Sequence, residues 1–176
     1  MRMRTKCCHT VLLLLAGACA SAAAAQTIEP PPITALHGYI GKWSCEGEFP
    51  ASRKKIFSTI EFRPDLGGMA LVKHHDDQRS TVNYHAIETW VYDAKQAHLV
   101  ASVVDNFGGV RTFYSDGIHD GTLTWTLQNA DQPMQKFVYT PMDDAHFRLD
   151  WMMARPGKGL VIGDTLTCAR VAAASG

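Results

Sequence analysis

The stretch Gly41–Phe49, GKWSCEGEF, places one cysteine two residues after a tryptophan. The next cysteine is Cys168, in the string DTLTCAR near the C-terminus. If these two strings are antiparallel neighbours with Cys45 opposite Cys168, Trp43 falls opposite Arg170. A guanidinium against an indole face contributes about 0.5–2 kcal/mol. We therefore predict that the first and last strands pair, joined by a disulfide and by a contact between Trp43 and Arg170.

The N-terminus has the three parts of a secretory signal. A basic start, MRMRTK, is followed by the short apolar run VLLLLAGACASA and by small residues in SAAAAQ. This order is typical of an exported precursor, and the apolar run is too short to span a bilayer as a helix. We predict a signal peptide over residues 1–25, cleaved after Ala25, and a periplasmic or secreted mature protein.

The cysteine count agrees with an oxidising compartment. Cys7, Cys8 and Cys19 leave with the signal, and Cys45 and Cys168 remain. The simplest expectation is one disulfide, which stabilises by about 4–5 kcal/mol in the chain-entropy model. Two buried free thiols, or an offset of one or two positions between the cysteines, are the alternatives. Lipidation of Cys19 is a further alternative, although LAGAC lacks the leucine that a lipobox has three residues before the cysteine.

The mature chain is large enough for one domain with a core. Removing the signal leaves 151 residues with 14 Lys+Arg and 17 Asp+Glu, a net charge of −3. This balance argues against nucleic-acid binding, which needs a basic surface, and no later segment is long and apolar enough for a membrane helix. We expect a Pro-rich tether over 26–35, one domain over 36–172 and a disordered tail over 173–176. The oligomeric state stays open.

Short strands and tight turns fill the domain. The runs alternate apolar with polar residues, are rich in β-branched and aromatic residues, and are separated by Gly, Asp and Asn turns. About ten strands are predicted, at 42–49, 55–62, 69–76, 82–92, 98–105, 110–115, 123–128, 136–140, 147–153 and 161–170. A meander of this length usually removes its edges by closing. The predicted fold is an all-β antiparallel up-and-down barrel, closed by its first and last strands.

These residues resemble a known family. GKW with the late Arg170 is similar to the Gly-x-Trp and returning-Arg signature of lipocalins and related calycins. The strings LHGYIGKW, LGGMALV, WVYDAKQAHL, SDGIHDGTLTW and TLTCAR resemble an uncharacterised group of bacterial lipocalin-like barrels, a domain of unknown function. The resemblance covers residues 36–170 and implies a barrel whose tryptophan plugs one end. Haem-binding barrels of similar shape use a histidine near the C-terminus. No histidine follows His146, so no haem or other cofactor is expected.

Alternation predicts which side chains point into the barrel. The interior set is Trp43, Cys45, Gly47, Phe49, Tyr84, Ala86, Glu88, Trp90, Tyr92, Leu123, Trp125, Leu127, Phe147, Leu149, Trp151, Met153, Leu160, Ile162, Leu166 and Cys168. For the strand at 82–92 the opposite face, with His85, Ile87 and Val91, is almost as apolar and remains an alternative.

The function most consistent with such a barrel is binding or carrying a small, mostly apolar ligand, because barrels of this size are just wide enough to hold one. The proposed ligand contacts are Tyr84, Glu88, Trp90, Arg111, Phe113, Trp125 and Trp151. An interior Glu88 needs a partner, which Arg111 could supply as part of a polar anchor. A purely structural salt bridge, or a Glu88 that points outward, is the competing interpretation.

Two other classes of function remain open. One is an enzyme with a histidine–carboxylate cluster at the barrel rim, for which His74, Asp76 and His85 are the candidates. Zinc requires three or four convergent ligands, and a solvated strand end explains the same residues better, so no metal site is assigned. There is no G-x-S-x-G string and no Gly-rich loop before a helix, so no catalytic residue is assigned either. The other class is a filled barrel that acts as a structural or interaction module.

Overall fold

The structure is a computed structural model, and it describes residues 32–78, 83–129 and 132–172. The predicted signal segment (1–25), residues 26–31 of the tether and the tail at 173–176 lie outside the described residues, as does the alternative lipidation site at Cys19. Among the described residues, no helix has the length and apolar character needed to cross a bilayer.

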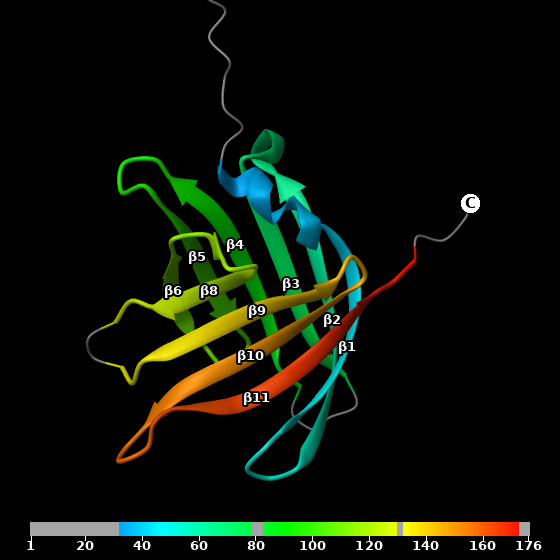
Figure 1. The fold of residues 1–176 in the computed structure, drawn as a ribbon, viewed down its shortest axis with the longest axis vertical. Coiled ribbons are helices and arrows are strands. Elements are labelled where there is room, and N and C mark those ends of the chain that lie inside the picture. The colour runs from blue at the N-terminus through cyan, green and yellow to red at the C-terminus, as the bar shows by residue number, and fades with distance from the viewer. Residues whose placement is uncertain (1–31, 79–82, 130–131, 173–176) are drawn as a thin grey trace, which may run out of the picture.

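Ten antiparallel strands form a closed barrel (Figure 1). From β1 to β6 and from β8 to β11, each strand pairs with the next strand along the chain. The pairs β1–β11 and β6–β8 complete the ring, while β7 pairs with β8 outside it. The predicted all-β barrel is therefore confirmed. The elements are η1 (Pro32–Tyr39), β1 (Gly41–Phe49), β2 (Lys54–Asp65), η2 (Leu66–Gly68), β3 (Ala70–Gln78), β4 (His85–Asp93), β5 (His98–Asp105), β6 (Val110–Ser115), β7 (Ile118–His119), β8 (Thr122–Leu127), β9 (Gln135–Asp143), β10 (His146–Arg155) and β11 (Gly159–Arg170).

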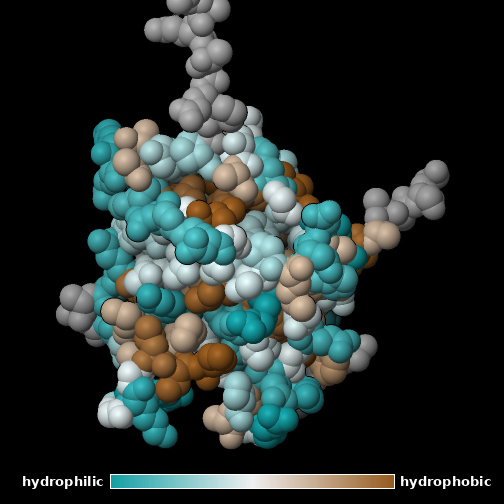
Figure 2. Space-filling view, viewed as in Figure 1, coloured by the Kyte–Doolittle hydropathy of each residue, from teal (hydrophilic) through white to brown (hydrophobic). Residues whose placement is uncertain are grey.

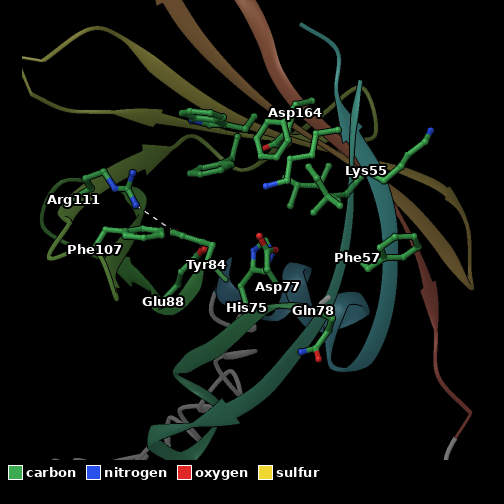
Figure 3. A pocket seen from close by; sticks show the side chains of 17 residues that line it. Lys55, Phe57, His75, Asp77, Gln78, Tyr84, Glu88, Phe107, Arg111 and Asp164 are labelled. Carbon is green, nitrogen blue, oxygen red and sulfur yellow. Dashed lines mark hydrogen bonds and ion pairs between the residues drawn. The ribbon is translucent and has the colours of Figure 1, made fainter. Parts of the chain in front are cut away.

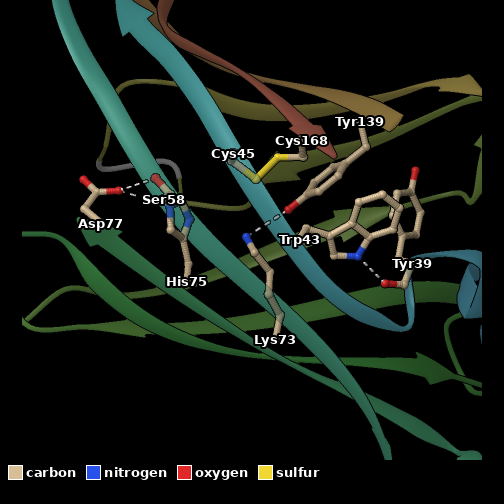
Figure 4. The surroundings of a disulfide bond; sticks show 9 residues. All are labelled: Tyr39, Trp43, Cys45, Ser58, Lys73, His75, Asp77, Tyr139 and Cys168. Carbon is tan, nitrogen blue, oxygen red and sulfur yellow. Dashed lines mark hydrogen bonds and ion pairs between the residues drawn. A yellow bond between two sulfur atoms is a disulfide. The ribbon is translucent and has the colours of Figure 1, made fainter. Parts of the chain in front are cut away.

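The first and last strands pair in the predicted register. Cys45 lies directly opposite Cys168, and a disulfide joins them across β1 and β11 (Figure 4). Trp43 lies opposite Arg170, whose guanidinium carbon is 4.1 Å from the centre of the indole ring. Both predictions are confirmed, and no offset between the cysteines is present. The alternative of two free thiols is not what the structure shows.

One end of the barrel is filled by aromatic side chains beneath η1. Ile33 and Leu36 of this helix are fully buried, and Trp43 donates its indole N–H to the carbonyl of Tyr39 at 2.7 Å. The ring of Tyr39 contacts four other rings of the core, namely Phe62, Trp90, Tyr139 and Phe147. Because Ile33 belongs to this core, the packed part of the chain begins before residue 36, inside the segment expected to be a tether.

A β-bulge in β11 corrects one part of the predicted interior. Trp151 pairs with Asp164 but Met152 pairs with Ile162, so Gly163 is an extra residue in the ladder. A bulge shifts the alternation of the residues beyond it. Ile162, expected inside with Leu166 and Cys168, is therefore 44% exposed. A Cβ at Gly163 would lie 2.5 Å from the ring of Trp151, so the bulge brings the backbone against that indole.

The outer face of the barrel is mostly polar in the view of Figure 2. Apolar side chains gather at the lower left of this view, where β9, β10 and β11 run. Ile162, displaced outward by the bulge, is one exposed apolar residue of these strands.

Candidate functional site

A pocket of about 300 Å³ lies at the end of the barrel opposite η1 (Figure 3). The β1–β2 hairpin, the end of β3, the start of β4 and the β5–β6 turn surround it, and β9, β10 and β11 complete its wall. Its apolar lining includes Ile56, Phe107, Phe137, Leu149 and Leu166. The barrel is therefore packed at one end and hollow at the other.

Four of the seven predicted ligand contacts line this pocket. They are Tyr84, Glu88, Arg111 and Trp151. The other three do not line it: Trp90 and Phe113 are fully buried and Trp125 is 1% exposed, all within the packed core. These three fill the interior because their rings pack against one another and against neighbouring aromatic residues, as in the 5.0 Å contact between the ring centres of Trp90 and Trp125.

Glu88 points inward, as predicted, but its partner is Lys73. Lys73 Nζ donates to Glu88 Oε1 at 2.6 Å and to the hydroxyl of Tyr139 at 2.9 Å. The other Glu88 oxygen accepts the indole N–H of Trp90 at 2.9 Å. The expected pairing with Arg111 is wrong because Lys73 stands directly opposite Glu88 in the β3–β4 ladder. The alternative in which Glu88 points outward is wrong as well. His85 and Ile87 are exposed, so the alternative interior face of β4 faces solvent.

Arg111 forms a second charged group at the pocket wall. Its guanidinium pairs with the carboxylate of Asp105 and donates to the hydroxyl of Tyr84 at 3.2 Å. Burial, followed by the nearby charge of Glu88, raises the pKa of Tyr84 to about 12. The Tyr84 phenol therefore stays protonated, and its ring stacks on Phe107 at the mouth of the pocket.

A histidine–aspartate pair on β3 was not predicted from the sequence. His75 Nε2 lies 3.3 Å from Asp77 Oδ1, and Ser58 donates to the same oxygen at 2.7 Å (Figure 4). Burial lowers the pKa of His75, so the ring is predominantly neutral at pH 7. Burial alone would raise the pKa of Asp77, but the hydrogen bonds from His75 and Ser58 outweigh it and lower the pKa. The alternation that begins at the buried Leu71 places His75 and Asp77 inside.

Asp164 is the second residue that was missed. It lies on β11, lines the pocket, and shares the inward face with Leu166 and Cys168. Burial, then the charges of Asp77 and Asp150, raise the pKa of Asp164 to about 7. The alternation that placed Leu166 and Cys168 inside also indicated Asp164. A carboxylate in this position changes its charge near neutral pH.

The other histidine candidates lie on the outer face of the barrel. His85 Nδ1 is 2.8 Å from Asp76 Oδ1, and both side chains are nearly half exposed. His74 instead contacts the guanidinium of Arg63 at 3.2 Å. Among the described residues, no group of three or more His, Cys, Asp or Glu side chains is arranged to hold a metal ion.

Fold and site together define a ten-stranded antiparallel barrel with a packed end and a pocket at the other end. Comparison with solved structures finds the crystal structure of Rv2717c from Mycobacterium tuberculosis, with a TM-score of 0.60 and 12% sequence identity over 81% of this chain and 98% of that chain. At this identity the likeness concerns the fold alone. No protein-family model and no curated protein matches the sequence.

Proposed function

We propose that this protein is an exported barrel that binds a small, mostly apolar molecule in the pocket opposite η1. The observation that carries the proposal is the composition of the pocket. Phe137, Leu149 and Trp151 form an apolar wall, and His75 and Asp164 add polar groups to it. Small-molecule sites in proteins have this character, with a few polar groups that fix the orientation of an apolar ligand.

The same geometry changes which residues are assigned to the ligand. Trp151, Tyr84 and Arg111 remain proposed contacts because they line the pocket. Glu88 lines it too, but both of its oxygens already accept hydrogen bonds, so its part is to hold the pocket wall. The polar contacts move to His75 and Asp164. The resemblance to lipocalin-like barrels supports the same function, since barrels of this kind carry ligands in their open end.

Export is the second part of the proposal. The signal-like sequence over residues 1–25 supports it, and so does the Cys45–Cys168 disulfide, because such bonds persist in oxidising compartments. In a cell that exports the protein, the processed chain is expected to begin after Ala25. The N-terminal sequence of the protein recovered from its host measures this directly.

Native mass spectrometry of the processed protein, purified from its own host, tests the proposed binding. We expect a co-purifying adduct of a few hundred daltons, which is the size that a pocket of this volume holds. The Trp151→Ala variant should lose the adduct, and Met142→Ala, which changes an exposed residue of β9, should keep it. Circular dichroism of each variant establishes that the barrel is intact. A chain that carries no adduct and binds no apolar compound would instead be a filled or interaction module.

A further inference from the structure

Three carboxylates line the pocket, those of Asp77, Glu88 and Asp164, together with three cationic side chains, those of Lys54, Lys55 and Arg111. Glu88 is neutralised by Lys73, and Arg111 by Asp105. The two remaining carboxylates are those of Asp77 and Asp164. Within residues 32–78, 83–129 and 132–172, neither of them forms an ion pair with a lysine or an arginine.

The neighbour of Asp77 does not supply the missing positive charge. Because burial keeps His75 neutral at pH 7, its contact with Asp77 is that of an uncharged ring. The side chain of Asp77 is 17% exposed, so water does not screen it fully. Burying a carboxylate without a cation is costly, and both carboxylates therefore favour a positively charged occupant of the pocket.

The aromatic lining favours the same kind of occupant. Tyr84, Phe107, Phe137 and Trp151 border the pocket in addition to the two carboxylates. A cation near the face of such rings gains about 0.5–2 kcal/mol, depending on how far it is removed from water. The two lysines of the lining, Lys54 and Lys55, favour a ligand with a carboxylate less, because both are exposed and Lys55 is already bound to Glu48.

We propose that the pocket selects a ligand that carries a protonated amine, which hydrogen bonds to Asp164 and Asp77 while its apolar part packs against Phe137, Leu149 and Trp151. This inference rests on the proposed function and adds the chemical class of the ligand. An ammonium group has three N–H donors, which is enough for one hydrogen bond to each carboxylate.

Binding of an amine should be coupled to the proton on Asp164. Because the pKa of Asp164 is about 7, this carboxyl is mostly protonated at pH 6 and mostly ionised at pH 8. If the amine binds the ionised form, its affinity rises about tenfold between these values. The charged and titratable groups around Asp164 are Lys54, Lys55, His75, Asp77, Tyr84, Glu88 and Arg111 in the pocket lining, Asp150 on the paired strand β10, and Lys73 on β3. Of these, Asp77 and Asp150 raise its pKa and Lys73 lowers it.

Three probes with one carbon skeleton separate the charge of the ligand from its apolar part. Isothermal titration calorimetry of the processed protein should compare phenylbutylamine, phenylbutanol and phenylbutanoic acid at pH 6 and pH 8. We expect the amine to bind most tightly, the alcohol about tenfold more weakly and the acid most weakly. Asp164→Asn should weaken the amine about tenfold, remove its pH dependence and leave the alcohol unchanged. Asp144→Asn, which alters an exposed carboxylate of the β9–β10 turn, is the matched control.

The outcomes distinguish this inference from the proposed function. If the alcohol or the acid binds as tightly as the amine, the preference for a cation is overturned and small-molecule binding stands. If the pH dependence persists in Asp164→Asn, the titrating group is a different one and the assignment of Asp164 is wrong. If none of the three probes binds, both the inference and the proposed function fail.

Discussion

The guanidinium carbon of Arg170 lies 4.1 Å from the ring centre of Trp43, and the two residues are directly opposed on the last and first strands. The same guanidinium donates to the carbonyl oxygens of Ile40 and Gly38, each at 2.6 Å. One side chain therefore ties the end of β11 to the start of β1 and to η1. This makes Arg170 a residue of the barrel's closure and places it away from the pocket.

Replacing Arg170 should destabilise the barrel. Arg170→Ala removes a cation–π contact and two charge-assisted hydrogen bonds, so we expect a loss of about 2–3 kcal/mol in the free energy of unfolding. Arg170→Lys should lose less, because an ammonium keeps the charge but cannot form both hydrogen bonds in the same plane. Urea titration followed by circular dichroism measures both. Arg155→Ala, at the exposed end of β10, should change the stability by less than about 0.5 kcal/mol. Equal losses in the two alanine variants would contradict this role of Arg170.

The disulfide should contribute a comparable share of the stability. The double variant C45A/C168A is expected to lose about 2–5 kcal/mol, because the bond restricts a loop of more than a hundred residues in the unfolded chain. A reducing agent should destabilise the natural protein by a similar amount and have no effect on the double variant. Alkylation of the native protein should leave both cysteines unmodified, and rapid labelling would show that the bond is absent.

Lys73 and Glu88 are expected to behave as a buried pair. Lys73→Met leaves the Glu88 carboxylate without its cation, so the free energy of unfolding should fall by about 3–5 kcal/mol. Adding Glu88→Gln to that variant removes the unpaired charge and should restore part of the loss. Lys158→Met, in the exposed β10–β11 turn, is the control for the loss of a lysine. Additive effects of the two substitutions would show that the residues are not coupled.

Asp164 should make the barrel less stable as the pH rises. The folded state holds the proton on this carboxyl up to about pH 7, whereas the unfolded chain releases it near the ordinary aspartate pKa of 3.8. The unfolded state therefore binds fewer protons between these values, and the free energy of unfolding falls with increasing pH. Asp164→Asn should remove this decrease in the free energy of unfolding. It should be more stable than the natural protein at pH 8, by on the order of 1–3 kcal/mol, and equally stable near pH 4.

The effect of Asp164 is measured as the difference in the free energy of unfolding between variants at each pH, because other groups titrate in the same range. Asp144→Asn should follow the natural protein at every pH, since that carboxylate is exposed. An Asp164→Asn variant with the same pH profile as the natural protein would mean that the carboxyl has an ordinary pKa.

Alternation and the two cysteines were enough to predict the barrel and its closing register. A directly opposed pair of cysteines fixes the partner of every other residue in β1, which is why Trp43 and Arg170 were placed correctly. The interior face of β4 was also correct, since the buried Ala86, Glu88 and Trp90 alternate with residues that are exposed or half-buried. Each of these predictions depends on spacing within one strand or on one known contact between two strands.

The parts that failed depend on contacts between strands whose relative register the sequence does not give. The pairing of Glu88 with Lys73 follows from the β3–β4 register, which alternation within β4 leaves undetermined. The bulge at Gly163 turns the side chain of Ile162 outward, because one unpaired residue shifts the alternation beyond it. His75 and Asp164 were overlooked for a simpler reason: the polar stretch around His75 was interpreted as a solvated strand end, and Asp164 was not considered although it alternates with Leu166 and Cys168.

The aromatic packing beneath η1 closes one end of the barrel, so that only the opposite end is open. Any molecule that enters the pocket meets the rings of the packed core at the bottom, and it must leave through the mouth by which it came. A ligand of the proposed kind would therefore enter and leave at the β1–β2 hairpin and the β5–β6 turn, where Phe107 borders the pocket. The residence time of a ligand would depend on the residues at this mouth, and the packed end would contribute to the stability of the barrel alone.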